Sequence, residues 1–206
     1  GMHRLAELRS KLGSTTLVGY DFASSFEELV VKRDADCFIV STEDGFSPLG
    51  MAREFFARNL GIDESAIARV ADWNRFENND VSLVDLSNGT RSSDLRGVIL
   101  AAGETSKCYT QFAQPRFGKP HRDFYYNVAY ESISHAANAL GAKKIAMSHL
   151  SGSGTFHGDI ATCIAEALGH FCDNPAEPEI DSFIFVGCCV DVGHLAGIQN
   201  LNHEGR

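Results

Sequence analysis

The sequence predicts an α/β fold with three layers, in which helices cover both faces of a mixed central sheet. Two observations predict it. Short apolar runs alternate along the chain with segments whose apolar residues recur at helical spacing. The runs contain no charged residue, which is typical of strands buried on both faces of a sheet. Alternating units of this kind stack into a layered α/β domain.

The expected central strands are uninterrupted apolar runs, namely Cys37–Val40, Val98–Ala102, Ile145–Met147 and Phe183–Val186. Val81–Leu86 alternates only in part between apolar and polar side chains, so we place it nearer an edge of the sheet. Leu17–Tyr20 and Ala66–Val70 are further candidate strands.

A first helix is expected after Ser47 and Pro48, which supply an N-cap and a first-turn proline, and it closes at Gly61. A second helix is expected over residues 123–140, with Gly141 as its terminator. Both segments place their apolar residues on one side, and that side must lie against the sheet.

The third helix begins near Asp159 or Ile160 and keeps its apolar spacing as far as Phe171. Residues 72–80 and 104–121 show no period, so both stretches are predicted to be loops. Loops of that length in a compact domain often carry function.

Length and composition indicate one domain. The 206 residues are 44% hydrophobic, which is enough for a single core that buries about 70% of the surface of the unfolded chain. Residues 1–206 show no internal repeat, and Gly1 before Met2 reads as an expression scar. The chain has no apolar N-terminal segment and no apolar span of about 18 residues, so we expect a soluble, cytoplasmic protein without membrane contact.

The net charge and the cysteine spacing limit which partners, metals and cofactors we expect. The formal net charge is −9 and no basic stripe offsets it, which disfavours nucleic acid as a partner. A local phosphate site is compatible with that charge. None of the six cysteines forms a CxxC pair or a zinc-finger spacing, so we expect reduced core thiols and predict neither a metal nor a cofactor. Assembly into a homo-oligomer stays open.

The most informative stretch is the loop 151–156, Ser-Gly-Ser-Gly-Thr-Phe, which lies between an apolar run and the third helix. Glycine lets backbone N–H groups approach an anion closely, and a helix N-terminus adds the positive end of its dipole. The strand-loop-helix order therefore predicts a phosphate-binding loop. Its expected ligand-binding residues are Gly152, Ser153, Gly154, Thr155 and Phe156.

The segment Tyr126–Asp191 resembles the C-terminal half of macro domains, which are ADP-ribose-binding modules. In that family, as in this chain, a helix precedes a strand, a Ser/Thr/Gly diphosphate loop, a second helix and a final apolar strand. Ala35–Thr42, followed by a helix ending at Gly61, looks like the first buried strand of the family and the helix after it. The resemblance covers roughly residues 19–191.

The resemblance implies a small-molecule nucleotide as partner, ADP-ribose or a relative, with its diphosphate on the residue 152–156 loop. It implies that Phe156 forms a wall beside the distal ribose. In the family an aspartate in a Gly-Asp-Ile-Thr stretch holds the adenine amino group. Asp21, in the stretch Gly19-Tyr20-Asp21-Phe22, looks like its counterpart.

The chain departs from the family after the first buried strand. Hydrolytic macro domains carry Asn-Ala-Ala-Asn there, whereas this chain has Ser41-Thr42-Glu43-Asp44. Ser41 and Thr42 are the expected ligand contacts. Two carboxylates would repel a diphosphate unless they have a chemical role. An alternative function is therefore a hydrolase of an ADP-ribosyl or phosphate ester, in which Asp44, Glu43 or a loop histidine activates water.

A further alternative is a non-catalytic assembly domain, which would resemble the N-terminal domain of leucine aminopeptidases. The candidate residues also have explanations that need no ligand. Asp21 fits a turn after a strand, the glycine loop fits a plain connection, and Phe156 fits a core position. Glu43 and Asp44 fit a solvated loop. At the level of sequence these readings stay open.

Overall fold

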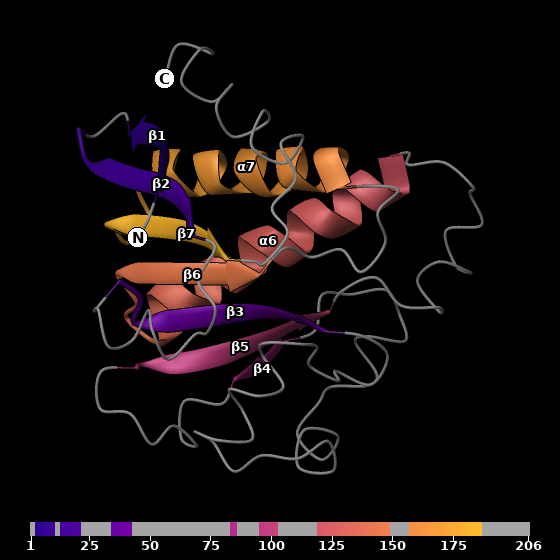
Figure 1. Ribbon diagram of the computed structural model, residues 1–206, viewed down its shortest axis with the longest axis horizontal. Coiled ribbons are helices and arrows are strands. Elements are labelled where there is room, and N and C mark those ends of the chain that lie inside the picture. The colour runs from indigo at the N-terminus through magenta and orange to yellow at the C-terminus, as the bar shows by residue number, and fades with distance from the viewer. Residues whose placement is uncertain are drawn as a thin grey trace.

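The computed structural model describes residues 3–10, 13–21, 34–42, 83–85, 95–102, 119–148 and 157–186. Within these ranges, seven strands form one sheet in the order β1-β2-β7-β6-β3-β5-β4 (Figure 1). The strands are β1 (His3–Arg9), β2 (Thr15–Asp21), β3 (Cys37–Thr42), β4 (Leu83–Asp85), β5 (Gly97–Ala102), β6 (Lys144–Ser148) and β7 (Ser182–Val186). The described helices are α6 (Lys119–Ala139) and α7 (His157–Asp173).

The sheet is mixed, as predicted. Strands β2, β7, β6, β3 and β5 run parallel to one another. β1 runs antiparallel to β2, and β4 runs antiparallel to β5 at the opposite end of the described sheet. The four expected central strands all lie in the interior, and the partly alternating run 81–86 contains the edge strand β4. The α/β fold class is therefore confirmed.

Helices α6 and α7 form a layer on one face of the sheet. α6 connects β5 to β6, and α7 connects β6 to β7, so both crossovers step along the sheet in the same direction. Because such crossovers are right-handed, both helices lie on the same face. They also pack against each other there (Figure 1). Each of these helices therefore starts at the carboxyl ends of the parallel strands.

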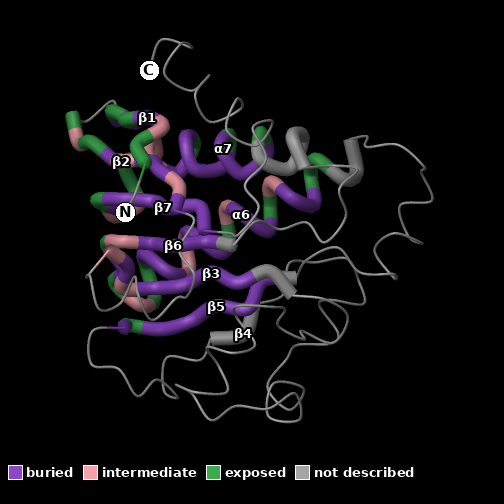
Figure 2. The backbone as a smooth tube through the Cα atoms, viewed as in Figure 1, coloured by how far each residue is buried: buried purple, intermediate pink, exposed green. Residues whose placement is uncertain are grey.

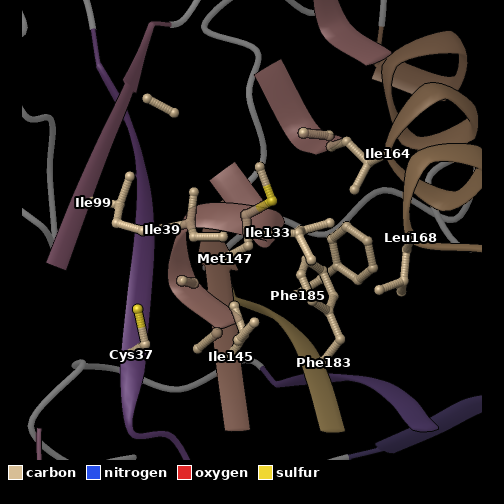
Figure 3. Packing of buried hydrophobic residues seen from close by; sticks show 14 of the residues in the cluster. Cys37, Ile39, Ile99, Ile133, Ile145, Met147, Ile164, Leu168, Phe183 and Phe185 are labelled. Atoms are coloured by element: carbon tan, nitrogen blue, oxygen red, sulfur yellow. The ribbon is translucent and has the colours of Figure 1, made fainter. Parts of the chain in front are cut away.

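The central strands are buried on both faces. Cys37, Phe38, Ile39 and Val40 of β3 are each at most 1% exposed, so neither face of β3 reaches solvent over these four residues (Figure 2). Fully burying one large apolar side chain contributes about 1.5–3 kcal/mol. Side chains from the sheet and from both helices meet in this core (Figure 3), among them Ile39, Ile133, Met147, Ile164, Leu168, Phe183 and Phe185.

The three cysteines in the described ranges form no disulfide bond. Cys37 and Cys163 are buried, and Cys172 is half-buried. They lie on β3 and α7 and add to the apolar interior. A buried thiol of this kind behaves as a small hydrophobic side chain.

Strand β1 is not predicted by the sequence pattern. Its seven residues mix charged and apolar side chains, and its pairing with β2 shifts register between Arg4 and Ala6. The shift breaks the alternation by which a half-buried strand is identified. As a result Ala6 and Leu8 are buried, while Arg4 and Glu7 form an exposed ion pair at 3.7 Å.

The helix starts differ from the predictions by up to four residues, about one turn. α6 begins at Lys119 instead of Asp123, so the predicted loop over residues 104–121 is wrong in its last residues. Pro120, which favoured a loop in the sequence, is accepted in the first turn because no N–H is needed there. α7 begins at His157, slightly before the predicted start.

The end of α6 agrees with the prediction. Gly141 has a φ of 66°, a left-handed conformation that glycine adopts without strain. The N–H of Ala142 donates to the carbonyl of Ala136 at 3.0 Å, so the chain after Gly141 satisfies one of the last four carbonyls of the helix. The predicted helix after Ser47, the candidate strand 66–70 and the predicted loop 72–80 lie outside the described residues.

Candidate functional site

The carboxyl ends of the parallel strands lie together at one edge of the sheet. Asp21, the last residue of β2, is paired with Val186, the last residue of β7, and Val186 is paired with Ser148 of β6. On the other side, Thr42 ends β3 opposite Ala102 of β5. Five strand ends therefore open toward the same side. In open α/β sheets, ligands bind outside this edge.

The strand order defines one point along that edge. β3 and β6 are hydrogen-bonded neighbours. The chain after β3 re-enters the sheet at β4 and β5, whereas the chain after β6 returns as β7 on the opposite side. The two outgoing connections thus diverge between β3 and β6. A divergence of this kind leaves a crevice at the carboxyl edge, which is the usual ligand position in such sheets.

Asp21 is a buried carboxylate at this edge. It is 6% exposed and is the final residue of β2. Within the described ranges, no hydrogen bond or ion pair reaches its carboxylate. An acidic group is costly to bury without donors. The interpretation of Asp21 as a turn residue after the strand is wrong, because Asp21 is the last residue of β2 itself and is shielded from water.

The side-chain direction of Asp21 follows from its neighbours on β2. Thr16 Oγ1 donates to the carbonyl of Ile180 at 2.7 Å and lies 3.6 Å from Cys172 Sγ of α7, so Thr16 faces the helical layer. Side chains alternate along a strand. Tyr20 therefore shares the helical face, where it stacks on His3 with ring centroids 4.8 Å apart. Asp21 projects from the opposite face of the sheet.

Ser41 and Thr42 are the last two residues of β3, so they belong to the strand instead of following it. Ile39 pairs with Met147, and β6 ends one residue later at Ser148. The backbone of Ser41 and Thr42 therefore extends past the end of β6, at the point where the connections diverge. Their position fits the predicted ligand edge.

The remaining predicted residues lie outside the described ranges. These are Glu43, Asp44, Gly152, Ser153, Gly154, Thr155 and Phe156. Chain connectivity still relates them to the edge, since Glu43 and Asp44 directly follow β3 and residues 149–156 join β6 to α7. The glycine loop is therefore the connection that leaves β6 at the point of divergence. Its role in ligand binding stays a prediction.

The position of α7 is fixed by polar and aromatic contacts that the sequence analysis does not anticipate. Tyr126 Oη and His170 Nδ1 are 2.7 Å apart and join α6 to α7 at an exposed position. Tyr130 packs edge-on against Phe171 with ring centroids 6.0 Å apart. Asn174 Nδ2 donates to the hydroxyl of Tyr130 at 3.2 Å. The available signal was the i, i+4 spacing of the two tyrosines.

Burial raises the pKa of the Tyr126 hydroxyl above its ordinary value, and the nearby Tyr130 and Glu166 act in the same direction. The hydroxyl therefore stays protonated and available as a donor over the physiological pH range. Within the described ranges, no group of His, Cys, Asp and Glu side chains is arranged to hold a metal ion. No helix there is long and apolar enough to cross a membrane.

Two solved structures share this arrangement along almost the whole chain. The Oceanobacillus iheyensis macrodomain with ADP superposes with a TM-score of 0.60 at 9% sequence identity, covering 98% of this chain and 94% of that chain. The same macrodomain with MES bound gives a TM-score of 0.59 at 9% identity, with 98% and 95% coverage. The chain has the macrodomain fold. Comparisons with protein-family models and with curated proteins found no match.

The likeness to the macrodomain covers both the described sheet and the helical layer, since it spans 98% of this chain. The likeness spans residues both before and after the diverging connections, so the resemblance seen in the second half of the sequence extends to the first half as a fold. Because the sequence identity is only 9%, the roles of the side chains at the edge must be derived from this chain alone. Asp21, Ser41 and Thr42 are the predicted site residues that the described part of the chain brings to that edge.

Proposed function

We propose that this macrodomain-fold protein binds ADP-ribose or a related nucleotide diphosphate at the carboxyl edge of its sheet. The observation that carries the proposal is Asp21, a 6% exposed carboxylate at that edge with no partner in the described ranges. A buried acceptor without a donor is a group that a ligand can satisfy.

The diphosphate is assigned to the connection between β6 and α7. Ser148 ends β6 and His157 begins α7, so the glycine- and serine-rich residues 151–156 lead directly into a helix N-terminus. Backbone N–H groups and the helix dipole favour an anion at such a position. Gly152 and Gly154 would allow the close approach that a diphosphate requires.

The base is assigned to Asp21. β2 and β6 are separated by β7 alone, so their ends lie about 10 Å apart at the usual spacing of neighbouring strands. A nucleoside bridges a separation of that order. The carboxylate of Asp21 would accept a hydrogen bond from the exocyclic amino group of adenine, while Ser41 and Thr42 of β3 would lie toward the distal ribose.

The solved macrodomain with ADP adds support, since ADP contains both the base and the diphosphate that this arrangement would hold. The first test is a thermal-shift titration with ADP-ribose, ADP, AMP and inorganic phosphate. A ligand that binds only the folded state raises the Tm. At a ligand concentration of a hundred times the Kd, the gain in unfolding free energy is about 2.7 kcal/mol. A rise with ADP-ribose and ADP that AMP does not match would support the diphosphate assignment. No rise with any nucleotide would refute the proposed function.

A hydrolase is the second candidate, and it has its own observation. Glu43 and Asp44 are the residues that immediately follow β3 at the point of divergence, where a carboxylate could activate water. In that case Asp44→Ala should lower turnover of an ADP-ribosyl ester before it lowers ADP-ribose affinity. Unchanged turnover and affinity would refute the role of Asp44. The assembly alternative requires a stable oligomer, so light scattering of a strictly monomeric, nucleotide-binding chain would remove it.

A further inference from the structure

The amino edge of the sheet, opposite the proposed nucleotide site, contains a residue that joins three strands. Asp36 immediately precedes β3. Its N–H donates to the carbonyl of Lys144 at 2.8 Å, and its carbonyl accepts from the N–H of Arg96 at 2.7 Å. The backbone of Asp36 thus connects β3 to the beginnings of both neighbours, β6 and β5.

The carboxylate of Asp36 repeats these connections through its side chain. Oδ1 accepts the N–H groups of Lys144 and Lys143 at 3.1 and 3.2 Å, and Oδ2 accepts that of Lys143 at 3.1 Å. Arg96 Nε lies 3.7 Å from Oδ2. The carbonyl of Lys143 in turn accepts the N–H of Asp181 at 2.8 Å, just before β7. The network therefore reaches four parallel strands.

The strands that this network joins need such an anchor because their sequences define register weakly. β3 is apolar and buried on both faces through Val40, and the neighbouring residues 98–101 of β5 and 145–147 of β6 are also buried and apolar. A one-residue slip normally moves apolar side chains onto a polar face. Here both faces are apolar, so that penalty is largely missing. A two-residue slip would shift β3 by about 7 Å.

We propose that Asp36 is a positioning residue for the nucleotide site at the far edge, because it fixes the register of β3 against β6. In the native register its carboxylate meets the N–H groups of Lys143 and Lys144. In a slipped register it loses those donors. The relative height of the β3 and β6 ends, and with it the spacing of the two connections that leave them, then depends on this carboxylate. This proposal rests on the proposed function, because it concerns the same site.

The experiment compares Asp36→Ala, Asp36→Asn and Ile133→Val in the full chain, with ADP-ribose as the probe. Asp36→Ala removes both acceptors and should weaken ADP-ribose binding about tenfold, within the usual range of coupling between distant sites. Asp36→Asn keeps a carbonyl oxygen where Oδ1 accepts both N–H groups and loses only the Oδ2 acceptor, so its affinity should fall clearly less than that of Asp36→Ala. Ile133→Val deletes a buried methyl group on α6 and should lower the Tm without changing affinity.

Hydrogen exchange supplies a readout that needs no ligand. Asp36→Ala should speed exchange of the β3 and β6 amides, and Asp36→Asn should restore most of their protection, whereas Ile133→Val should leave the difference between these strands and the rest of the sheet unchanged. Unaltered exchange in Asp36→Ala, or the same loss in Asp36→Asn, would overturn the proposal. If the natural chain binds no nucleotide, the proposed function fails, and the exchange data still decide whether Asp36 fixes the register.

Discussion

Ile39 of β3 lies directly opposite Met147 of β6, yet the chain leaves these neighbouring strands toward opposite sides of the sheet. The pair marks the point where the two connections diverge. Both side chains are fully buried (Figure 3), so the base of the proposed site is a rigid apolar layer. Sites built on the ends of packed strands hold their geometry better than sites built on loops alone.

The first prediction concerns the connection between β6 and α7. Gly154→Glu should abolish measurable ADP-ribose binding, because a carboxylate in this loop would fill the space of the diphosphate and repel its charge. Isothermal calorimetry measures the affinity. Asn127→Glu, at an exposed position of α6, adds the same charge elsewhere and should bind ADP-ribose normally. Undiminished binding in Gly154→Glu would remove the loop from the site.

The second prediction concerns the end of α6. Gly141 has a φ of 66°, and an added Cβ would meet Arg96 Nη1 only at an ordinary contact distance of 3.5 Å. The cost of Gly141→Ala is therefore conformational and should be about 1–2 kcal/mol of unfolding free energy. Gly141→Asn, which tolerates this conformation better, should cost less. Urea denaturation measures both variants, and equal stabilities for the alanine and asparagine variants would contradict the explanation.

The sheet interior could be predicted from the sequence because its strands are apolar on both faces. Cys37–Val40 and Phe183–Val186 contain no charged residue, so few other structures could bury them. The edge strand β1 could not be predicted from the sequence, because its register shift between Arg4 and Ala6 breaks the periodicity that marks a half-buried strand. Strands are predicted from the alternation of apolar and polar residues, and a bulge interrupts that alternation.

The candidate site could be predicted only in part. Asp21 was a candidate by resemblance, but its burial and its lack of a partner in the described ranges depend on which strands flank β2, which the sequence does not specify. Asp36 was not predicted as a site residue, because a charged residue just before a strand is usually interpreted as exposed to solvent. Its partners Lys143 and Lys144 lie more than a hundred residues away along the chain, beyond any local pattern.

The third prediction is a pH dependence of stability through Tyr126. Burial, then Tyr130 and Glu166, raise its pKa in the folded state. Above an ordinary tyrosine pKa of about 10, the unfolded chain loses this proton while the folded chain keeps it. The unfolded state then binds fewer protons, so stability falls as the pH rises through this range. Tyr126→Phe should remove that part of the alkaline loss, as measured by denaturant unfolding between pH 8 and 11, a range of about three units around that pKa.

At neutral pH the same variant should be less stable by about 0.5–1.5 kcal/mol, because it lacks the hydrogen bond to His170. Tyr130→Phe is a suitable control. It loses the bond from Asn174 and the lesser contribution of Tyr130 to the raised pKa of Tyr126, so it should keep most of the alkaline loss, which burial causes first. If Tyr126→Phe and the natural chain lose stability in parallel as the pH rises, the assignment to Tyr126 is wrong.

The last prediction separates stability from function at Asp21. If a residue has only a structural role, its removal lowers both the stability of the protein and its ligand binding. Asp21→Ala should instead leave the unfolding free energy unchanged or higher, because the variant no longer buries a carboxylate without a partner in the described ranges. Its affinity for ADP-ribose should fall about 10- to 100-fold, which corresponds to the loss of a hydrogen bond to a charged group.

The base provides the matched test for the same residue. The natural chain should prefer ADP-ribose to its hypoxanthine analogue. The analogue lacks the amino group from which Asp21 would accept a hydrogen bond, and a site built around a hydrogen bond rejects a ligand that cannot make it. Asp21→Ala should bind both ligands equally weakly. Tyr20→Phe changes the adjacent residue on the opposite face of β2 and should keep the preference. If Asp21→Ala also keeps it, another group reads the base, and Asp21 is buried for a structural reason.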